Sequence, residues 1–161
     1  MLGQDACFRH DGHEGVVSVP ARHKVHMKMF PDPGAGRLAY IYADIDSVGI
    51  EFSPELCAIA HNNIKIVEQA TGSRLDISVI EGDVTHYEIK DDQNVFFFFN
   101  PFDDVVLEAV VKNIKKSLQR KPREIAVIYY NPVHSHILDN AFLPKNGYII
   151  GGEEYMLYAN C

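Results

Sequence analysis

Residues 48–55 read Val-Gly-Ile-Glu-Phe-Ser-Pro-Glu, and this stretch decides the fold class of the 161-residue chain. Its first half is a short apolar strand. Ser53 followed by Pro54 is typical of a helix N-cap with proline at the first helical position. An apolar stripe with helical spacing continues from there, and Gly72 is a suitable terminator. We therefore expect a short strand that leads directly into a helix at 54–70.

The same alternation of strand and helix continues along the chain. The second clear helix has aspartates at its start and lysines towards its end, an arrangement that the helix dipole favours. Strands that alternate with helices form a mostly parallel sheet, and two final strands joined at a glycine pair can add an antiparallel hairpin. The predicted strands are 25–30, 48–52, 76–80, 94–99 and 124–130, the predicted helices are 54–70, 103–118 and 133–142, and the predicted hairpin is 148–159.

The composition is that of an ordinary globular domain. Hydrophobic residues make up 47% of the chain and charged residues 23%. The length suits a single domain over residues 1–161, with an irregular N-terminal segment at 1–30. The net charge of −7 disfavours binding to nucleic acid, because such binding draws much of its affinity from clustered Lys and Arg. We therefore expect a small molecule or a protein as the substrate.

Three features predict a cytoplasmic location with no membrane span. The longest apolar run, at 95–99, is far shorter than the roughly 20 residues that cross a bilayer. The amino terminus is polar and lacks the apolar core of a signal peptide. Cys7, Cys57 and Cys161 are odd in number and widely spaced, which argues against a disulfide framework and for a reducing compartment.

The residues that follow each strand carry the functional information, because ligands of an open parallel sheet bind beyond the carboxyl ends of its strands. Asp32, Gly34 and Gly36 follow the first strand. Glycines let a ligand approach the backbone closely, although this pattern also fits an ordinary turn. Glu51 ends the second strand, where a carboxylate can accept hydrogen bonds from two ribose hydroxyls or simply face solvent. Asp83 follows the third strand, where it can accept from an exocyclic amino group or cap a turn.

The fourth strand ends in a distinctive group, residues 100–102, with the sequence Asn-Pro-Phe. A polar amide, a rigid φ angle and an aromatic ring at the end of a buried strand are hard to explain by packing alone. Other groups at strand ends that could lie near a reacting substrate are Tyr130, Asn131 and His134, although a buried tyrosine or a surface histidine is the simpler description of them.

Taken together, these residues resemble the class I S-adenosylmethionine-dependent methyltransferases, over about residues 32–158 and most closely at 48–64 and 95–114. The resemblance implies an α/β, Rossmann-like three-layer sandwich, S-adenosylmethionine as the cofactor, and methyl transfer as the activity. The implied cofactor-binding residues are Asp32, Gly34, Gly36, Glu51, Phe52, Asp83 and Val84, and the implied residues of the methyl-transfer pocket are Asn100, Pro101 and Phe102.

Each part of the cofactor has its own residues in this assignment. The loop with the two glycines supports the methionine part, and Glu51 holds the ribose. Phe52 flanks the adenine, whose edge is bound by Asp83 and Val84. The reaction would be an in-line displacement in which the protein contributes mainly orientation and exclusion of water.

The loop after the first strand departs from the family pattern. Only 19 residue steps separate Asp32 from Glu51, and a parallel crossover needs about a dozen residues or more, so the first crossover helix is at most short. One alternative is therefore a catalytically degenerate relative that binds a partner or stabilises an oligomer. Residues 34–39 also fit the Gly-x-Gly-x-x-Ala pattern, which leaves an NAD-binding oxidoreductase as a further alternative.

Neither a metal site nor a fixed oligomeric state is indicated. His10 with His13 and His23 with His26 have a spacing that metal ligands can use, but no paired cysteines or helix hold it, so solvated histidines are the better interpretation. The amino terminus lacks the helical extension that covers the cofactor in this family. This leaves room for a homodimer in which a second subunit completes the site.

Overall fold

A computed structural model describes residues 24–27, 46–99 and 102–161. Its elements alternate between strand and helix along the chain, and the predicted α/β class is confirmed. In chain order they are β1 (Lys24–Met27), β2 (Ser47–Glu51), α2 (Pro54–Thr71), β3 (Ile77–Glu81), the short 3-10 helix η1 (Val84–His86), β4 (Gln93–Phe99), α3 (Asp104–Arg120), β5 (Ala126–Tyr130), α4 (Ser135–Asp139), β6 (Leu143–Ile150) and β7 (Glu153–Ala159).

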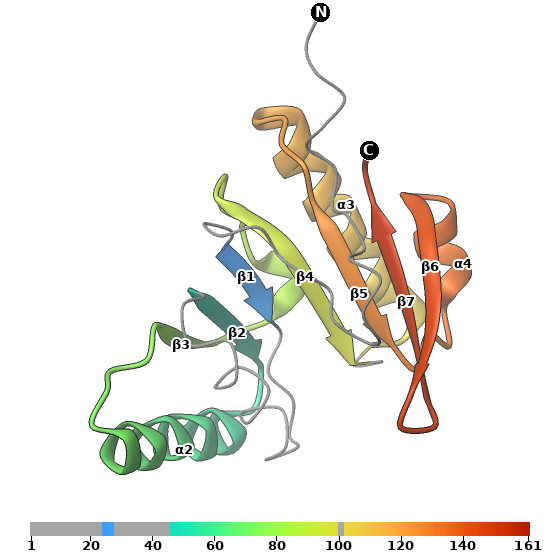
Figure 1. The fold of residues 1–161 in the computed structure, drawn as a ribbon. Helices are drawn as coiled ribbons and strands as arrows, with labels where there is room; N and C mark the ends of the chain where they lie inside the picture. The colour runs from blue at the N-terminus through green and yellow to red at the C-terminus, as the bar shows by residue number, and fades with distance from the viewer. Residues whose placement is uncertain (1–23, 28–45, 100–101) are drawn as a thin grey trace, which may run out of the picture.

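The strands form one seven-stranded sheet in the order β3-β2-β1-β4-β5-β7-β6 (Figure 1). Neighbours from β3 to β5 are parallel, whereas β7 is antiparallel to both β5 and β6. The crossover through α2 runs towards one edge of the sheet, and the crossover through α3 runs towards the other. Because such crossovers are right-handed, the two helices cover opposite faces and make a three-layer sandwich. The direction reverses between β1 and β4, which makes this the topological switch point.

The helix α2 begins and ends where the sequence predicts. The Ser53 Oγ accepts a hydrogen bond from the backbone N–H of Leu56 at 3.3 Å, and Pro54 occupies the first turn. Gly72 ends the helix with a φ of 67°, a left-handed conformation that glycine adopts without steric cost. The local signals in this stretch therefore determine both ends of the helix.

The main core lies between the sheet and α3. Asp103 caps α3 by accepting a hydrogen bond from the N–H of Val106 at 2.9 Å. The apolar stripe of α3 then packs on alternate residues of β4 and β5. Fully buried members of this core include Leu107, Ile114, Ile125, Val127, Leu138 and Tyr158. None of the helices among the described residues is long and apolar enough to cross a membrane.

Two expectations differ from the structure. The strand β6 begins at Leu143 rather than at Tyr148, because its first half is an exposed edge strand that pairs with β7 through its backbone and carries no alternating apolar pattern. Cys57 is a free, buried thiol, whereas Cys161 is disulfide-bonded, so the argument against disulfides is wrong for Cys161. Spacing along the sequence does not reveal which cysteines come close enough to form a bond.

The buried hydroxyl of Tyr158 in this core leads to a prediction about the stability of the fold. The Tyr158 ring is fully buried, and its hydroxyl lies near the Asp139 carboxylate but makes no hydrogen bond of good geometry with a described residue. We expect Tyr158→Phe to raise the free energy of unfolding by about 1 kcal/mol, because an unpaired buried hydroxyl opposes folding. Urea unfolding of both proteins at neutral pH measures the difference. A loss of stability in the variant would contradict the assignment.

The same residue predicts a dependence on alkaline pH. Burial and the nearby carboxylate of Asp139 raise the pKa of Tyr158 in the folded chain above its value in the unfolded chain. The unfolded chain therefore releases this proton first, at about pH 10. Below that pH the raised pKa costs no stability, and above it the free energy of unfolding falls as the pH rises. Above that pH, the stability of the wild-type protein should fall more steeply than that of Tyr158→Phe.

Candidate functional site

The carboxyl ends of β2 and β3 lie side by side at one edge of the sheet. Glu51 and Glu81 are in register, and the N–H of Gly82 donates a hydrogen bond to the carbonyl of Glu51 at 2.9 Å. This bond places the segment that continues to Asp83 directly beside the end of β2. Two of the predicted ligand-binding segments, far apart in the sequence, are thus brought together at the edge where open sheets bind ligands.

Glu51 is a buried carboxylate that accepts through only one of its two oxygens from the described part of the chain. Only 6% of the residue is exposed, and its Oε1 accepts a hydrogen bond from the N–H of Ser53 at 2.9 Å. No described residue donates to Oε2. Below it, the Cys57 Sγ donates to the carbonyl of Glu51 at 3.4 Å, and burial together with Glu51 and Glu81 raises the pKa of that thiol. Such a carboxylate can accept a hydrogen bond from a ligand hydroxyl without changing its own conformation, because the bond from Ser53 already fixes its orientation.

Asp83 serves as a turn cap in the structure. Its Oδ1 accepts from the backbone N–H of Thr85 at 2.8 Å and from the Thr85 hydroxyl at 2.7 Å, and Oδ2 lies 3.3 Å from the Nδ1 of His86. The capping alternative from the sequence is therefore observed, and it fixes the carboxylate at the end of β3. The side chain of Val84 packs against the core on the α3 side, and its carbonyl accepts from the N–H of Tyr87 at 3.2 Å, which leaves its backbone N–H as the part available to a ligand.

The two phenylalanines of the predicted site have different surroundings. Phe52 follows Glu51 directly and is 78% exposed, as a residue that flanks a ligand ring in the free protein would be. The Phe102 ring packs edge-on against Phe98, with ring centroids 6.0 Å apart, and belongs to the periphery of the core on the α3 side. Phe102 therefore has a packing role whatever else it contacts. The other predicted site residues lie outside the described residues and stay predictions: Asp32, Gly34, Gly36, Asn100 and Pro101.

A row of aromatic residues near the same edge was not recognised from the sequence. Phe99, Tyr130, Tyr155 and Tyr148 are in register across β4, β5, β7 and β6. The Phe99 and Tyr130 rings are stacked at 4.2 Å, and Tyr130 meets Tyr155 edge-on at 4.8 Å. All four are half-buried. Only the strand order makes them neighbours, so the available signal in the sequence is limited to an aromatic residue near one end of each strand.

The end of β5 has an unusual backbone. Asn131 has a φ of 46°, a left-handed conformation that is uncommon outside glycine, and its N–H donates to the carbonyl of Glu154 at 2.8 Å. Such conformations cluster at binding and catalytic sites, and here the bond to β7 holds this one in place. The His134 ring lies farther along, at the start of α4, with its centroid 6.3 Å from that of His136. Within the described ranges, no group of His, Cys, Asp and Glu could hold a metal ion.

These features define the class of fold. A seven-stranded sheet with a reversed β7 between β5 and β6, acidic residues at the ends of β2 and β3, and a switch point between β1 and β4 is the fold of class I S-adenosylmethionine-dependent methyltransferases. The resemblance of the sequence to this class and the predicted mostly parallel sheet with a carboxyl-terminal antiparallel hairpin are confirmed at the level of the fold.

Solved structures with the same fold support this assignment. A mutant of MtNAS in complex with S-adenosylmethionine aligns with a TM-score of 0.64 at 16% identity, over 88% of this chain and 55% of that one. The pyocyanin biosynthetic protein PhzM aligns with a TM-score of 0.64 at 11% identity, over 88% and 51% of the two chains. A putative methyltransferase from Pseudomonas syringae has a TM-score of 0.61 at 14% identity, over 88% and 91%.

The chain thus spans about half the length of MtNAS and PhzM. No model of a known protein family matches the sequence, and no curated protein does either.

Proposed function

We propose that this protein binds S-adenosylmethionine and transfers its methyl group to a small-molecule or protein acceptor. The observation that carries the proposal is the buried carboxylate of Glu51, which Ser53 holds through one oxygen while the other accepts no hydrogen bond from a described residue. It lies at the end of β2, beside the segment that leads to Asp83. A ribose and an adenine edge are suitable ligands for these two groups.

The residues at this edge fit an adenosine. Glu51 would accept from the ribose hydroxyls, the exposed Phe52 would cover one face of the adenine, and Asp83 with the backbone of Val84 would bind its edge. Asp32, Gly34 and Gly36 would support the methionine part, and Asn100, Pro101 and Phe102 would line the transfer pocket. The bound cofactor supplies an electrophilic methyl group on a sulfonium. The protein orients the acceptor and excludes water, which supplies much of the rate in such displacements.

The aromatic row extends the proposal towards the acceptor. Phe99 and Tyr130 lie at the carboxyl ends of β4 and β5, and Tyr155 continues the row on β7. Half-buried rings at this position can pack against an apolar part of the acceptor and keep water away. Asn131, in its left-handed conformation, presents a polar amide next to them. These groups are the acceptor wall of the proposed site.

The alternatives from the sequence receive less support. An NAD-binding oxidoreductase of the Rossmann type has the strand order 3-2-1-4-5-6. Here the antiparallel β7 is inserted between β5 and β6. A catalytically degenerate relative would share the fold, and it differs from an active enzyme only in turnover. The identity of the acceptor and a cytoplasmic location remain predictions.

A calorimetric titration with S-adenosylmethionine and S-adenosylhomocysteine tests the proposal. We expect weak binding of both ligands and a loss of about ten- to a hundred-fold in affinity in Glu51→Gln, because one charge-assisted hydrogen bond contributes about 1.5–3 kcal/mol. Glutamine can still accept from the N–H of Ser53, so the fold should persist. Glu124→Gln is the matched control. This half-buried carboxylate precedes β5 and therefore lies at the amino-terminal ends of the parallel strands, opposite to the end that carries Glu51.

The outcomes separate the candidate functions. Binding that Glu51→Gln weakens and Glu124→Gln leaves unchanged supports the site. Binding of S-adenosylhomocysteine without release of product from any acceptor in a broad panel would favour the degenerate relative. If neither ligand binds the wild-type protein at millimolar concentration, the proposal is wrong.

A further inference from the structure

A groove with a basic rim separates α3 from α4. Its volume is about 540 Å³, and its apolar floor includes Val111 and Ile137. The rim carries Lys112, Lys115 and Lys116, which are all exposed. Lys115 extends over the ring of Phe142, with its Nζ 5.9 Å from the ring centroid. The groove therefore combines positive charge with an apolar floor.

The charge of this groove is not neutralised within the described part of the chain. No described carboxylate forms an ion pair with any of the three lysines. Arg120, on the last turn of the same helix, does pair with Glu88 and Asp91. The groove lining also contains one carboxylate, Glu108, so three lysines face one acidic residue, which in a chain with a net charge of −7 is a local reversal of charge. Such a surface favours an occupant that carries both carboxylates and apolar side chains.

The tip of the β6–β7 hairpin has this chemistry. Ile149 is 80% exposed and Ile150 is 45% exposed, although both are large apolar side chains. The turn that follows leads into Glu153 and Glu154, which are exposed and form no ion pair with a described residue. The two isoleucines suit the apolar floor of the groove, and the two glutamates carry the charge opposite to that of its lysine rim.

The groove and the hairpin lie on the same side of the sheet, the side of β6 and β7, and the hairpin tip projects past α4 (Figure 1). The helix α4, which forms one wall of the groove, packs against β6 and β7, as the red end of the ribbon in Figure 1 shows. A two-fold axis beside this end can therefore place each hairpin tip in the groove of the other molecule. This is the reciprocal contact that a symmetric dimer requires.

We propose that the α3–α4 groove binds the β6–β7 hairpin tip of a second copy of this chain. The contact buries Ile149 and pairs Glu153 and Glu154 with the three lysines. It does not depend on cofactor binding or methyl transfer. Because much of the attraction is between exposed charges, the dimer weakens as the salt concentration rises.

Sedimentation equilibrium of the full chain at low salt tests the proposal. The wild-type protein should form a dimer in the micromolar to submillimolar range. Charge reversal of the groove, by Lys112→Glu, Lys115→Glu and Lys116→Glu together, should weaken association by at least about ten-fold, because like charges then face each other. Reversal of the tip by Glu153→Lys and Glu154→Lys should do the same. Ile149→Ser, which leaves the charge unchanged, should also weaken it.

The decisive measurement is a mixture of the two charge-reversed proteins. Each one repels itself, but the acidic groove of the first matches the basic tip of the second, and the remaining groove and tip keep their original charges. The mixture should therefore form a heterodimer. A control with the same change in net charge, placed away from the groove, is the triple variant Lys65→Glu, Arg74→Glu and Lys90→Glu, which should dimerise like the wild type. A monomeric wild-type protein, reversed variants that still dimerise, or a mixture that stays monomeric would overturn the proposal.

Discussion

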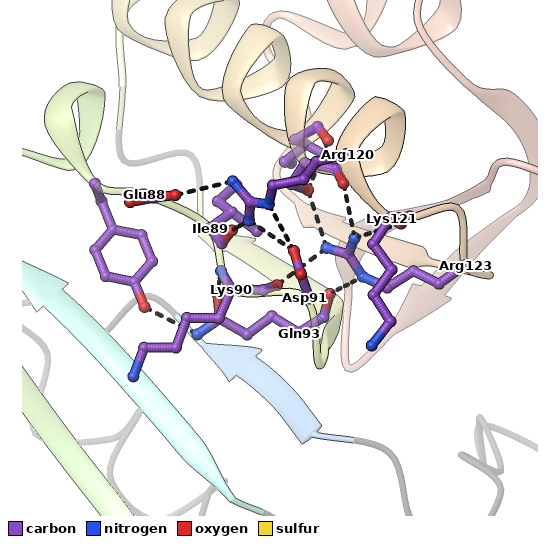
Figure 2. A network of polar contacts seen from close by, with 11 residues as sticks. Glu88, Ile89, Lys90, Asp91, Gln93, Arg120, Lys121 and Arg123 are labelled. Carbon is purple, nitrogen blue, oxygen red and sulfur yellow. Dashed lines mark hydrogen bonds and ion pairs between the residues drawn. The ribbon is translucent and has the colours of Figure 1, made fainter.

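Replacement of Arg123 by alanine is expected to lower the free energy of unfolding by about 3 kcal/mol. The guanidinium group lies between the end of α3 and the start of β4 (Figure 2). It donates to the carbonyls of Gln93 at 2.8 Å, Lys90 at 3.3 Å, Ser117 at 3.3 Å and Lys121 at 3.2 Å, and to the Ser117 hydroxyl at 2.9 Å. Alanine removes all of these donors at once.

The size of this loss of stability depends on the hydrogen-bond acceptors that Arg123→Ala leaves without a donor. Two of these acceptors, the carbonyls of Ser117 and Lys121, belong to the end of α3, where the helix dipole also favours a positive charge. Ser117 itself is buried, so water replaces the lost donors only in part. Burial lowers the pKa of Arg123, because its charged form gives up part of its hydration at this position.

Neighbouring Arg120 provides a matched control. Its ion pairs with Glu88 and Asp91 are largely exposed, and such pairs contribute about 0–1 kcal/mol each. It donates to one backbone carbonyl, that of Ile89 at 2.6 Å, whereas Arg123 donates to four. Arg120→Ala should therefore lower stability by about half as much as Arg123→Ala or less. Arg123→Lys keeps the charge but loses the planar fork, so it should be intermediate. Urea unfolding measures all three, and equal losses for Arg120→Ala and Arg123→Ala would show that the donated bonds have no special role.

The parts of the fold that the sequence predicts correctly are those with local causes. Ser53, Pro54 and Gly72 determine the ends of α2 within a few residues of chain. The aspartates before α3 and the apolar stripe within it do the same for that helix. The β-strands 76–80, 94–99 and 124–130 are predicted to within two residues at either end, because the first alternates between polar and apolar residues and the other two are short apolar runs. In all of these cases the side chains that decide the structure are neighbours in sequence.

The parts that the sequence does not predict depend on contacts between distant residues. Arg123 reaches carbonyls about 30 positions away, at Gln93 and Lys90, and no local pattern marks them. The aromatic row exists only once β7 lies between β5 and β6. An edge strand such as the first half of β6 is exposed on both faces, so it lacks the alternation that would reveal it. For the candidate site, the sequence allows Asp83 either to bind a ligand or to cap a turn. The structure shows the cap through Oδ1, with Oδ2 next to the imidazole of His86.

The largest loss of stability is expected from Ile114→Ala, at about 3–4 kcal/mol. Ile114 is 0% exposed and lies on the face of α3 that packs against the sheet, in the same cluster as Phe96, Val127 and Tyr158. Truncation removes buried methyl and methylene groups from this cluster. The surrounding strands are held by their hydrogen bonds and cannot close the space, so the cost includes the cavity as well as the lost transfer free energy.

The matched control is the same substitution on an exposed surface of a helix. Ile66 lies on α2 and is 54% exposed, so Ile66→Ala should change stability by less than about 1 kcal/mol, and the better helix propensity of alanine offsets part of the loss. Chemical unfolding of both variants gives the comparison.

The position of α3 also bears on the candidate site. The Asn113 side chain, next to Ile114, donates to the carbonyl of Thr85 at 2.7 Å, which links α3 to the turn after Asp83. If Ile114→Ala is no more costly than Ile66→Ala, then α3 does not provide the main core, and the position of that turn must depend on other contacts.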